Sequence, residues 1–562
     1  MPPRRSARAA SVKPASTAAE KAAAKPASKA VATKSTTSKP ASKTAPKSTA
    51  RAAKRPASPE NEPPPPAKRR AAPKIVENGV LEKAAAEVPE KVKAAPAPAP
   101  RKAPGRPRAP RHAPAGGHQN PLPTAPEHIR PTPQLFVWGA GNFGQFGMGV
   151  DALGDYEKPK RNPWIEKAIQ EGRFGEDDAG LETIAAGGLH SLFIDEKGAV
   201  WSCGVNDDAA LGRITSNVPN PDKEGEFLDI DTLTAQPFPL QSLVDEKFRA
   251  VRAAAGDTIS AAISDEGELR VWGSFRGVEG ILGFSSGLRH QFLPAPILNG
   301  KSAEKFTSVV AGNNHLLVLT VQGGLYAWGA GEQGQLGRRV LERRKIHGTV
   351  PEKIVLGSRT HKAVTIGAGS YTSFAVDDKG EVWAWGLNNM GQTGTGFRGP
   401  QDAEVSMPKR VVGLSKTELG GEEHVVQIAG GEHHTLFLTS TGKVYACGRS
   451  DGGQVGIDSE DEAFKDAAFP DMLETPALVT FPDDDDPIVH ISAGIHNNLA
   501  VSKEGALYSW GTGPQGELGA GDDSEIKTPK AIVRREGGSW ATVVASCGGQ
   551  HSMALLAPRK KS

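Results

Sequence analysis

Short apolar runs follow one another along the chain from Leu135 onward, and paired runs are joined by a turn that contains glycine. Residues 315–329, HLLVLTVQGGLYAWG, and residues 371–386, YTSFAVDDKGEVWAWG, are examples. Two short β-strands joined by a tight turn produce this pattern, because glycine accepts the backbone angles that such turns require. The pattern therefore predicts a chain built from β-hairpins.

The hairpins recur with one fixed internal distance. A motif Ala-Gly-x-x or Gly-Gly-x-x precedes what we call the slot residue, and a glycine stands fourteen residues after it. The six slot and glycine pairs are His190/Gly204, Ile259/Gly273, His315/Gly329, Thr372/Gly386, His434/Gly448 and Asn497/Gly511. Successive slot residues are 69, 56, 57, 62 and 63 residues apart, so the linkers between hairpins carry the variation. Fixed hairpins with variable linkers are typical of propeller blades.

Two half-repeats remain at the ends of this region. FVWGAGNFGQFG (136–147) lacks a preceding hairpin start, and VVASCGGQHSMALL (543–556) lacks the Trp-Gly that should follow. An N-terminal strand that joins the last C-terminal strands in one shared blade would seal the ring and remove two open sheet edges. We therefore predict an all-β fold, a seven-bladed β-propeller over residues 135–556 that is closed by a split blade.

The residues before the ring differ sharply in composition. Residues 1–134 contain 27 Lys and Arg, 8 Glu, no Asp and no Phe, Trp or Tyr, a net charge of +19, whereas the remainder has 40 basic and 56 acidic residues, a net charge of −16. Such a segment cannot bury enough apolar surface to offset the entropy lost on folding. We expect a disordered basic tail over residues 1–134 and a short basic tail over residues 557–562.

Clusters of basic residues in the N-terminal tail indicate nuclear import. Lys54 and Arg55 are followed, after twelve residues, by Lys68, Arg69 and Arg70. This arrangement predicts a two-part signal for a nuclear import receptor, and a charge run that only solubilises the chain is the alternative.

A second motif in the tail indicates DNA. Residues 104–108, PGRPR, are similar to the core of an AT-hook, in which Arg106 and Arg108 would lie along a narrow minor groove. Non-specific attraction to phosphates, which a strongly basic arm supplies by releasing counterions, is the alternative. Both interpretations predict nucleic acid as a partner.

The chain offers little for covalent chemistry. Its three cysteines, Cys203, Cys447 and Cys547, form no CxxC pair, and no motif of a hydrolase, metalloprotease or phosphate loop stands out. GxGxxG occurs three times without a following amphipathic helix, so we expect tight turns there rather than dinucleotide sites. We expect no cofactor, no bound metal and no membrane-spanning segment.

Four histidines recur at the slot position or its equivalent, and we call them the slot histidines. They are His190, His315, His434 and His551. They come from different blades, and the ring is too wide for them to share a metal ion. We expect them to form hydrogen bonds that tie neighbouring blades.

The AGxxH motifs, the Trp-Gly pairs and GxxGQLG (331–337) make the chain similar to the regulator of chromosome condensation family, whose members are seven-bladed propellers with a split blade. The resemblance covers the whole predicted ring. It implies a guanine nucleotide exchange factor for the small GTPase Ran, a regulator without covalent chemistry. Because one fold hosts many functions, a propeller that serves only as an interaction scaffold is the alternative. A tryptophan photoreceptor would need repeated Gly-Trp-Arg-His-Thr runs, and none occurs.

One repeat departs from the others after Trp272. Residues 273–287, GSFRGVEGILGFSSG, replace the usual GxGxxGQLG turn, and we call them the wedge. The resemblance implies that this segment projects from the ring and enters the nucleotide site of Ran. The wedge residues expected to act there are Ser274, Phe275, Arg276, Gly277, Val278, Glu279 and Gly280.

The resemblance also implies polar GTPase contacts in the turns of several repeats. The matching positions are Asp257, Arg338, His433, His551, and Asn314 and Asn142, which stand where the family has Asp. An amide lacks the charge of a carboxylate but still forms hydrogen bonds. The net charge of −16 on the ring suits a basic GTPase surface and would raise the rate of encounter.

A basic loop, RRVLERRK, follows the GQLG turn of one repeat, and it contains Arg339, Arg343, Arg344 and Lys345. It lies where family members carry a loop that contacts the acidic surface of the histone octamer, and a solvated loop is the alternative. Arginine suits such a surface because it forms paired bonds to carboxylates. The partners implied are Ran, nucleosome histones, DNA and an import receptor, for a monomeric ring at chromatin in the nucleus.

Overall fold

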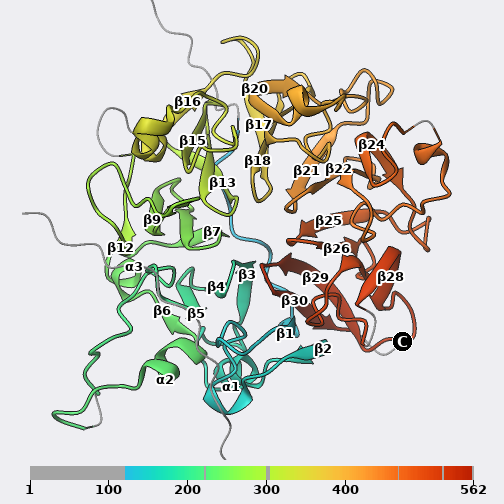
Figure 1. Cartoon of the computed structure of the whole chain (residues 1–562). Coiled ribbons are helices and arrows are strands. Elements are labelled where there is room, and N and C mark those ends of the chain that lie inside the picture. Colours follow the sequence, from blue (N-terminus) through green and yellow to red (C-terminus); the bar gives the residue numbers. More distant parts are fainter. Residues whose placement is uncertain (1–119, 221–222, 299–303, 466, 522–523, 560–562) are drawn as a thin grey trace, which may run out of the picture. The chain divides into compact units, whose positions relative to one another are not determined.

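The computed structural model of the chain describes residues 120–562, apart from residues 221–222, 299–303, 466, 522–523 and 560–562. Within this part, the strands form seven four-stranded antiparallel sheets around a central axis (Figure 1). The predicted seven-bladed β-propeller is confirmed. The basic clusters of the tail, from Lys54 to Arg108, lie outside the described residues.

Six blades are nearly continuous in sequence, and the first strand of each is the innermost. Blade 1 consists of β3 (Leu181–Ala186), β4 (His190–Asp195), β5 (Val200–Gly204) and β6 (Phe238–Pro239). Blade 2 consists of β7 (Ala250–Ala255), β8 (Ile259–Ser264), β9 (Leu269–Gly273) and β12 (Gln291–Ala295). Blade 3 consists of β13 (Phe306–Ala311), β14 (His315–Thr320), β15 (Leu325–Gly329) and β16 (Glu352–Ile354).

The same plan continues through the next three blades. Blade 4 consists of β17 (Ala363–Ala368), β18 (Thr372–Asp377), β19 (Val382–Leu387) and β20 (Glu404–Arg410). Blade 5 consists of β21 (Val425–Gly430), β22 (His434–Thr439), β23 (Val444–Arg449) and β24 (Met472–Val479). Blade 6 consists of β25 (Ile488–Ala493), β26 (Asn497–Ser502), β27 (Leu507–Thr512) and β28 (Glu525–Val533).

Blade 7 is the split blade. Its strand order is β2 (Tyr156–Arg161), β1 (Gln134–Gly139), β30 (His551–Pro558) and β29 (Trp540–Cys547). β1 pairs with β30 without interruption, from Gln134 opposite Leu556 to Gly139 opposite His551. The N-terminal side contributes two strands where the sequence indicated one, and the predicted closure is otherwise confirmed.

The fourteen-residue spacing follows from strand register. In blades 1 to 6 the slot residue begins the second strand and lies opposite the glycine near the end of the third, as His315 lies opposite Gly329. Gly386 shows why glycine is needed there. Its φ is +116°, and a Cβ atom would lie 2.2 Å from the Tyr371 carbonyl oxygen. Any larger residue would separate the two strands.

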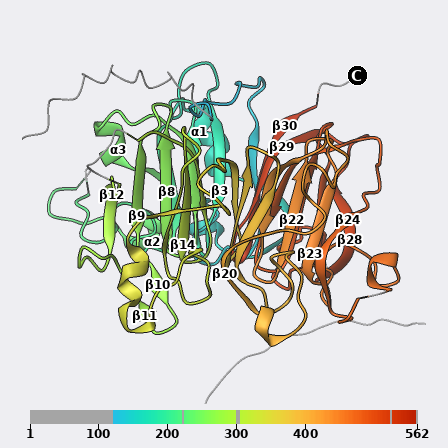
Figure 2. The ribbon, with the colours of Figure 1, turned by 90° about the horizontal axis from the view of Figure 1, so that it is seen from above.

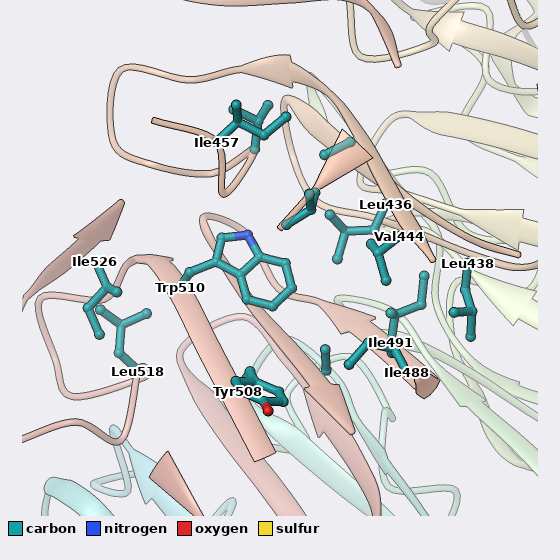
Figure 3. Close-up of a cluster of buried hydrophobic side chains, with 14 of the residues drawn as sticks. Leu436, Leu438, Val444, Ile457, Ile488, Ile491, Tyr508, Trp510, Leu518 and Ile526 are labelled. Atoms are coloured by element: carbon teal, nitrogen blue, oxygen red, sulfur yellow. The ribbon is translucent and has the colours of Figure 1, made fainter. Parts of the chain in front are cut away.

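The hydrophobic core is divided among the seven contacts between adjacent blades, each of which holds one cluster of buried side chains. Figure 3 shows the cluster between blades 5 and 6, where the Trp510 indole lies between Leu436 on one side and Ile526 on the other. Every blade thus depends on both neighbours to bury its apolar faces.

Short helices and turns occupy the linkers. They are α1 (Pro163–Gln170), α2 (Ile230–Ala235), α3 (Gln241–Asp245), and the 3-10 segments η1 (Val150–Ala152), η2 (Glu342–Thr349), η3 (Pro400–Asp402) and η4 (Glu462–Phe464). A separate two-strand ribbon, β10 (Arg276–Gly277) with β11 (Gly280–Ile281), lies within the wedge.

The two faces of the ring carry different turns. The turns before the slot residues and those after the paired glycines lie on one face, because each slot residue lies opposite its glycine, and we call this the turn face. The wedge lies there too, since it follows Gly273. The hairpin turns between the second and third strands lie on the opposite, far face.

Residues 120–133 pack against the far face, and we call them the far-face strap. Asn120 is buried and bonds to the carbonyl groups of Val321, Thr320 and Ala363, while Arg130 donates two bonds of 2.8 and 2.7 Å to Glu196. In Figure 1 the strap crosses the ring toward β1.

The strap corrects the expectation of a disordered tail that reaches residue 134. Residues 120–133 contain no Phe, Trp or Tyr, and polar bonds to backbone groups and carboxylates hold them instead of a hydrophobic cluster. Composition could not reveal such bonds.

Candidate functional site

The slot histidines connect neighbouring blades, as predicted. The Nε2 atoms of His190, His315 and His551 lie 2.8, 2.9 and 2.9 Å from serine hydroxyls of the next blade, and His434 Nε2 lies 2.7 Å from Asn498 Oδ1. The serine hydroxyls also donate to backbone carbonyls, so their oxygens accept from Nε2–H. Burial lowers the pKa of His190, His315 and His434 to about 4 and that of His551 to about 3. The slot histidines are therefore neutral structural links.

The contact between blades 2 and 3 departs from this scheme. Ile259 occupies the slot, and the facing position holds Leu316, so an apolar pair replaces the hydrogen bond. Trp138, Trp272, Trp385 and Trp510 each donate to a carbonyl in a turn of the preceding blade, at 2.8 to 3.2 Å. Trp328 Nε1, which is buried in blade 3, has no hydrogen-bond partner. The turn that would supply its acceptor is the one that the wedge replaces.

The base of the wedge fills that place with aromatic side chains. Phe275 is fully buried, its ring centroid lies 5.3 Å from that of Phe284, and both belong to the cluster that contains Trp328. Ser274 is buried as well and donates to the Arg289 carbonyl at 2.8 Å. Ser274 and Phe275, which the sequence placed among the GTPase contacts, thus anchor the wedge to the ring.

The tip of the wedge is exposed. Gly277 pairs with Gly280, so Val278 and Glu279 form the two-residue turn between β10 and β11. Val278 is 80% exposed and the Glu279 side chain 82% exposed. Figure 2 shows the ribbon projecting at the edge of the ring beside η2. An apolar side chain is thereby presented to solvent on a short, hydrogen-bonded ribbon.

Side chains of both neighbouring blades hold the wedge. Arg276 Nη1 lies 2.5 Å from Asp208 Oδ2, in a turn of blade 1, and the Arg276 amide donates to Asn314 Oδ1 of blade 3 at 3.0 Å. The Val278 amide donates to both carboxylate oxygens of Glu332, at 3.2 and 3.1 Å. The wedge therefore has a defined shape before any partner binds.

Asp257 lies close to this group at the mouth of the central channel. Its side chain is exposed, and desolvation by the surrounding turns raises the pKa of its carboxyl, an effect that Arg276 opposes. Asn314, which accepts from the wedge backbone, also opposes the rise in the pKa of the Asp257 carboxyl. The structure thus brings Asp257, Asn314 and the wedge together, with the amide of Asn314 serving as a hydrogen-bonding group.

The other predicted contacts are spread around the ring. Asn142 is exposed in blade 7 and donates to Asp155 at 2.7 Å, and His433 is half-buried in blade 5, where desolvation lowers its pKa. Arg338 donates to the carbonyls of His347, Gly348 and Val350, so it organises the linker around η2. His551 is buried between blades 7 and 1. In the part of the chain that the structure describes, none of these four residues forms a hydrogen bond or ion pair with the wedge.

The central channel opens among the turns of all seven blades. Its cavity has a volume of about 490 Å³ and is lined mainly by alanine, glycine and other small residues of the innermost strands. In the described ranges, no group of three or more His, Cys, Asp or Glu is placed to hold a metal ion. No helix among the described residues is long and apolar enough to span a membrane.

The basic loop divides into two parts. Arg339, Arg343 and Arg344 are exposed, whereas Lys345 turns toward the wedge. Its Nζ lies 2.7 Å from Glu342, 3.3 Å from Glu279 and 3.6 Å from Glu332. Sequence analysis did not identify Asp208, Glu332 or Lys345 as partners of the wedge. Their positions carry no periodic signal, and pairs so distant in sequence are visible only in the fold.

Comparison with known proteins identifies a consistent set of similar chains. A sequence model of the RCC1-like domain matches residues 134–554. Protein pim1 of Schizosaccharomyces pombe is 33% identical over 77% of this chain and 77% of its own, and the guanine nucleotide exchange factor SRM1 of Saccharomyces cerevisiae is 32% identical over 75% and 86%. The crystal structure of Saccharomyces cerevisiae Prp20p, described with its binding properties to Gsp1p and histones, superposes with a TM-score of 0.65 at 30% identity, covering 76% of this chain and 92% of that one. Prp20 has also been solved bound to Kap60.

Proposed function

The chain belongs to the family of RCC1-like domains, and on this premise we propose that it is a guanine nucleotide exchange factor that acts on the small GTPase Ran at chromatin in the nucleus. One observation carries the proposal. A single blade replaces its standard turn by a projecting ribbon, and side chains of the two neighbouring blades hold that ribbon in a fixed shape. A ring that served only as a scaffold would have no need of this exception.

The wedge suits a mechanism based on linkage. The Val278 tip would enter the phosphate region of the GTPase, and the surrounding turns would bind the nucleotide-free form more tightly than the loaded form. The nucleotide then dissociates faster because the two ligands of the GTPase weaken each other. This mechanism uses no covalent step, and the nucleotide concentrations set the direction of exchange.

The fixed shape of the wedge contributes to this mechanism. A flexible ribbon would lose conformational entropy when it entered the GTPase, and that loss would weaken binding of the nucleotide-free form. The bonds from Asp208, Asn314 and Glu332 order the ribbon in advance. We infer that more of the interface energy is then available to displace the nucleotide.

Chromatin and import partners follow from the basic segments. The tail clusters at Lys54–Arg55 and Lys68–Arg70 would bind an import receptor, and Arg106 and Arg108 would lie in the minor groove of DNA. The exposed Arg339, Arg343 and Arg344 would contact acidic histone surface. Prp20p has been described with its binding properties to Gsp1p and histones, and it has been solved bound to Kap60. These descriptions support the proposed set of partners.

The test is release of a fluorescent guanine nucleotide from purified Ran by the full-length protein, with Ras-like and Rho-like GTPases as controls. We expect the protein to accelerate nucleotide release from Ran but not from the Ras-like or Rho-like GTPases. A variant that lacks residues 276–283 should keep its circular dichroism and melting temperature but lose acceleration. Failure of the intact, folded protein to accelerate release from Ran would contradict the proposed function and favour the scaffold.

A further inference from the structure

Lys345 occupies an unusual position for a residue of a basic, solvent-facing loop. Its side chain is only 20% exposed, and three carboxylates, those of Glu342, Glu279 and Glu332, lie within 3.6 Å of its Nζ atom. They come from its own loop, from the wedge tip and from the turn after β15. Lys345 is therefore the common cation of three segments that are separate in sequence.

Glu332 is the most buried of these carboxylates and has a second contact. Its side chain is 14% exposed, and its two oxygens accept from the backbone amide of Val278. Gly277 makes this approach possible, because a Cβ atom there would lie 2.7 Å from Glu332 Oε1. The carboxylate thus links Lys345 to the backbone of the wedge tip.

The charges explain why the link depends on Lys345. Without the cation, Glu279, Glu332 and Glu342 would be three carboxylates close together, and like charges at such distances repel each other. Glu332 could relieve the repulsion by turning toward solvent, and the Val278 amide would then lose its acceptor. The tip of the wedge would become more mobile while the Phe275 base stayed in place.

We propose that Lys345 is a positioning residue, which acts through Glu332 to fix the tip of the wedge in the shape that displaces nucleotide. This inference rests on the proposed exchange function. It separates Lys345 from Arg339, Arg343 and Arg344 of the same loop, which are exposed and form no ion pair with the wedge among the described residues.

The experiment compares full-length variants at Lys345 with a control variant at a second lysine. Lys345→Met removes the charge at similar length, Lys345→Arg keeps it, and Lys353→Met is the matched control, because Lys353 forms a 2.7 Å pair with Glu304 on the same blade, away from the wedge. Mass spectrometry measures hydrogen exchange of a peptide that spans residues 274–284, without any GTPase present. Nucleotide release from Ran is measured over a range of Ran concentrations.

Lys345→Met should speed amide exchange at the wedge tip and lower the maximal rate of nucleotide release about three- to tenfold, with KM little changed. Lys345→Arg and Lys353→Met should resemble the parent protein in both measurements. Glu332→Ala should reproduce the effect of Lys345→Met, and the double variant should add little to either, because the two residues act in one chain of contacts.

The outcomes separate two kinds of failure. If the parent protein does not accelerate release from Ran, the exchange function is wrong, and the amide exchange measurement still tests the contact between Lys345 and the wedge. If the parent is active but Lys345→Met changes neither measurement, the inference is overturned. Full additivity of Lys345→Met and Glu332→Ala would also overturn it, since Lys345 would then not act through Glu332.

Discussion

Arg276 at the start of β10 and Asp208 in the turn after β5 form an ion pair with 2.5 Å between Nη1 and Oδ2. Asp208 also lies 3.3 Å from His290 Nε2, and its side chain is only 5% exposed. The wedge grows out of blade 2 but is tied to blade 1 by this pair. A substitution of Asp208 should therefore alter the position of the wedge.

Asp208→Asn should lower nucleotide release several-fold and destabilise the ring by about 1 kcal/mol, because Arg276 is partly exposed and water replaces part of the lost interaction. Exchange kinetics and urea unfolding measure the two effects. The control is Asp207→Asn, which changes the exposed neighbour. Equal behaviour of the two variants would mean that the ion pair does not influence the wedge.

N-terminal truncation should act in three steps. Removal of residues 1–119 should leave the melting temperature unchanged, and removal of residues 1–133 should lower it, because the bonds of Asn120 and Arg130 are lost. Removal of residues 1–140 should lower it far more, since β30 then loses its partner β1. Thermal melts of the three proteins measure these steps. A chain beginning at residue 141 that melted like one beginning at residue 134 would contradict the role of β1 in closing the ring.

The slot histidines should make the ring sensitive to acid. Their pKa is lowered by burial to between about 3 and 4, so the unfolded chain binds protons that the folded chain does not. The free energy of unfolding is therefore highest above about pH 6.5, which is the pKa of histidine in the unfolded chain. It falls as the pH drops toward 4, by about 1.4 kcal/mol per pH unit for each histidine. The urea midpoint should fall markedly between about pH 7 and pH 5, before most carboxylates titrate.

A single substitution tests whether one of these histidines takes up a proton when the chain unfolds. His434→Gln keeps a side chain that can donate to Asn498 but removes one titrating group, so the slope of stability against pH should decrease by about one proton. At neutral pH this variant should lose some stability because its amide cannot reproduce the imidazole geometry. A slope identical to that of the parent would show that His434 does not titrate on unfolding.

Changing Arg343 and Arg344 to Ala should weaken binding to nucleosomes more than binding to free DNA. Both arginines are exposed and lie on the loop that we propose contacts histones, whereas DNA affinity should come mainly from the tail and fall steeply with salt. A salt series of both affinities, with a protein lacking residues 1–119 for comparison, makes the measurement. An equal loss for nucleosomes and free DNA would reduce the loop to another phosphate contact.

The sequence predicted the ring because each blade repeats the same local pattern. The pairing of His315 with Gly329, and its counterparts in the other blades, could be read as a constant spacing. Two features could not be predicted from the repeated pattern. The far-face strap has polar bonds to backbone groups in place of an apolar pattern, and the contact of Lys345 with Glu279 joins residues far apart in the chain.

The candidate site was predicted in position but only partly in detail. The departure of residues 273–287 from the repeat located the wedge, yet spacing does not show which side of a segment faces the core. For example, Phe275 and His551 are buried in the structure, although the family resemblance implied that they contact a GTPase. Arg338 holds the backbone of its own linker, which a motif cannot reveal.

The contact between blades 2 and 3 lacks the hydrogen bond that a slot histidine supplies at four other contacts, so resistance to deformation is uneven around the ring. The pair Ile259 and Leu316 supplies no directional bond there, and the Trp328 indole keeps an unpaired N–H that costs about 1–3 kcal/mol. Apolar packing tolerates small sliding motions better than a hydrogen bond does, because it has no preferred angle. The ring is therefore more compliant directly beneath the wedge than at the four contacts that a slot histidine links. A partner that pushes on the ribbon would meet a contact that can slide there, while the histidine links on either side of it, between blades 1 and 2 and between blades 3 and 4, keep the ring closed.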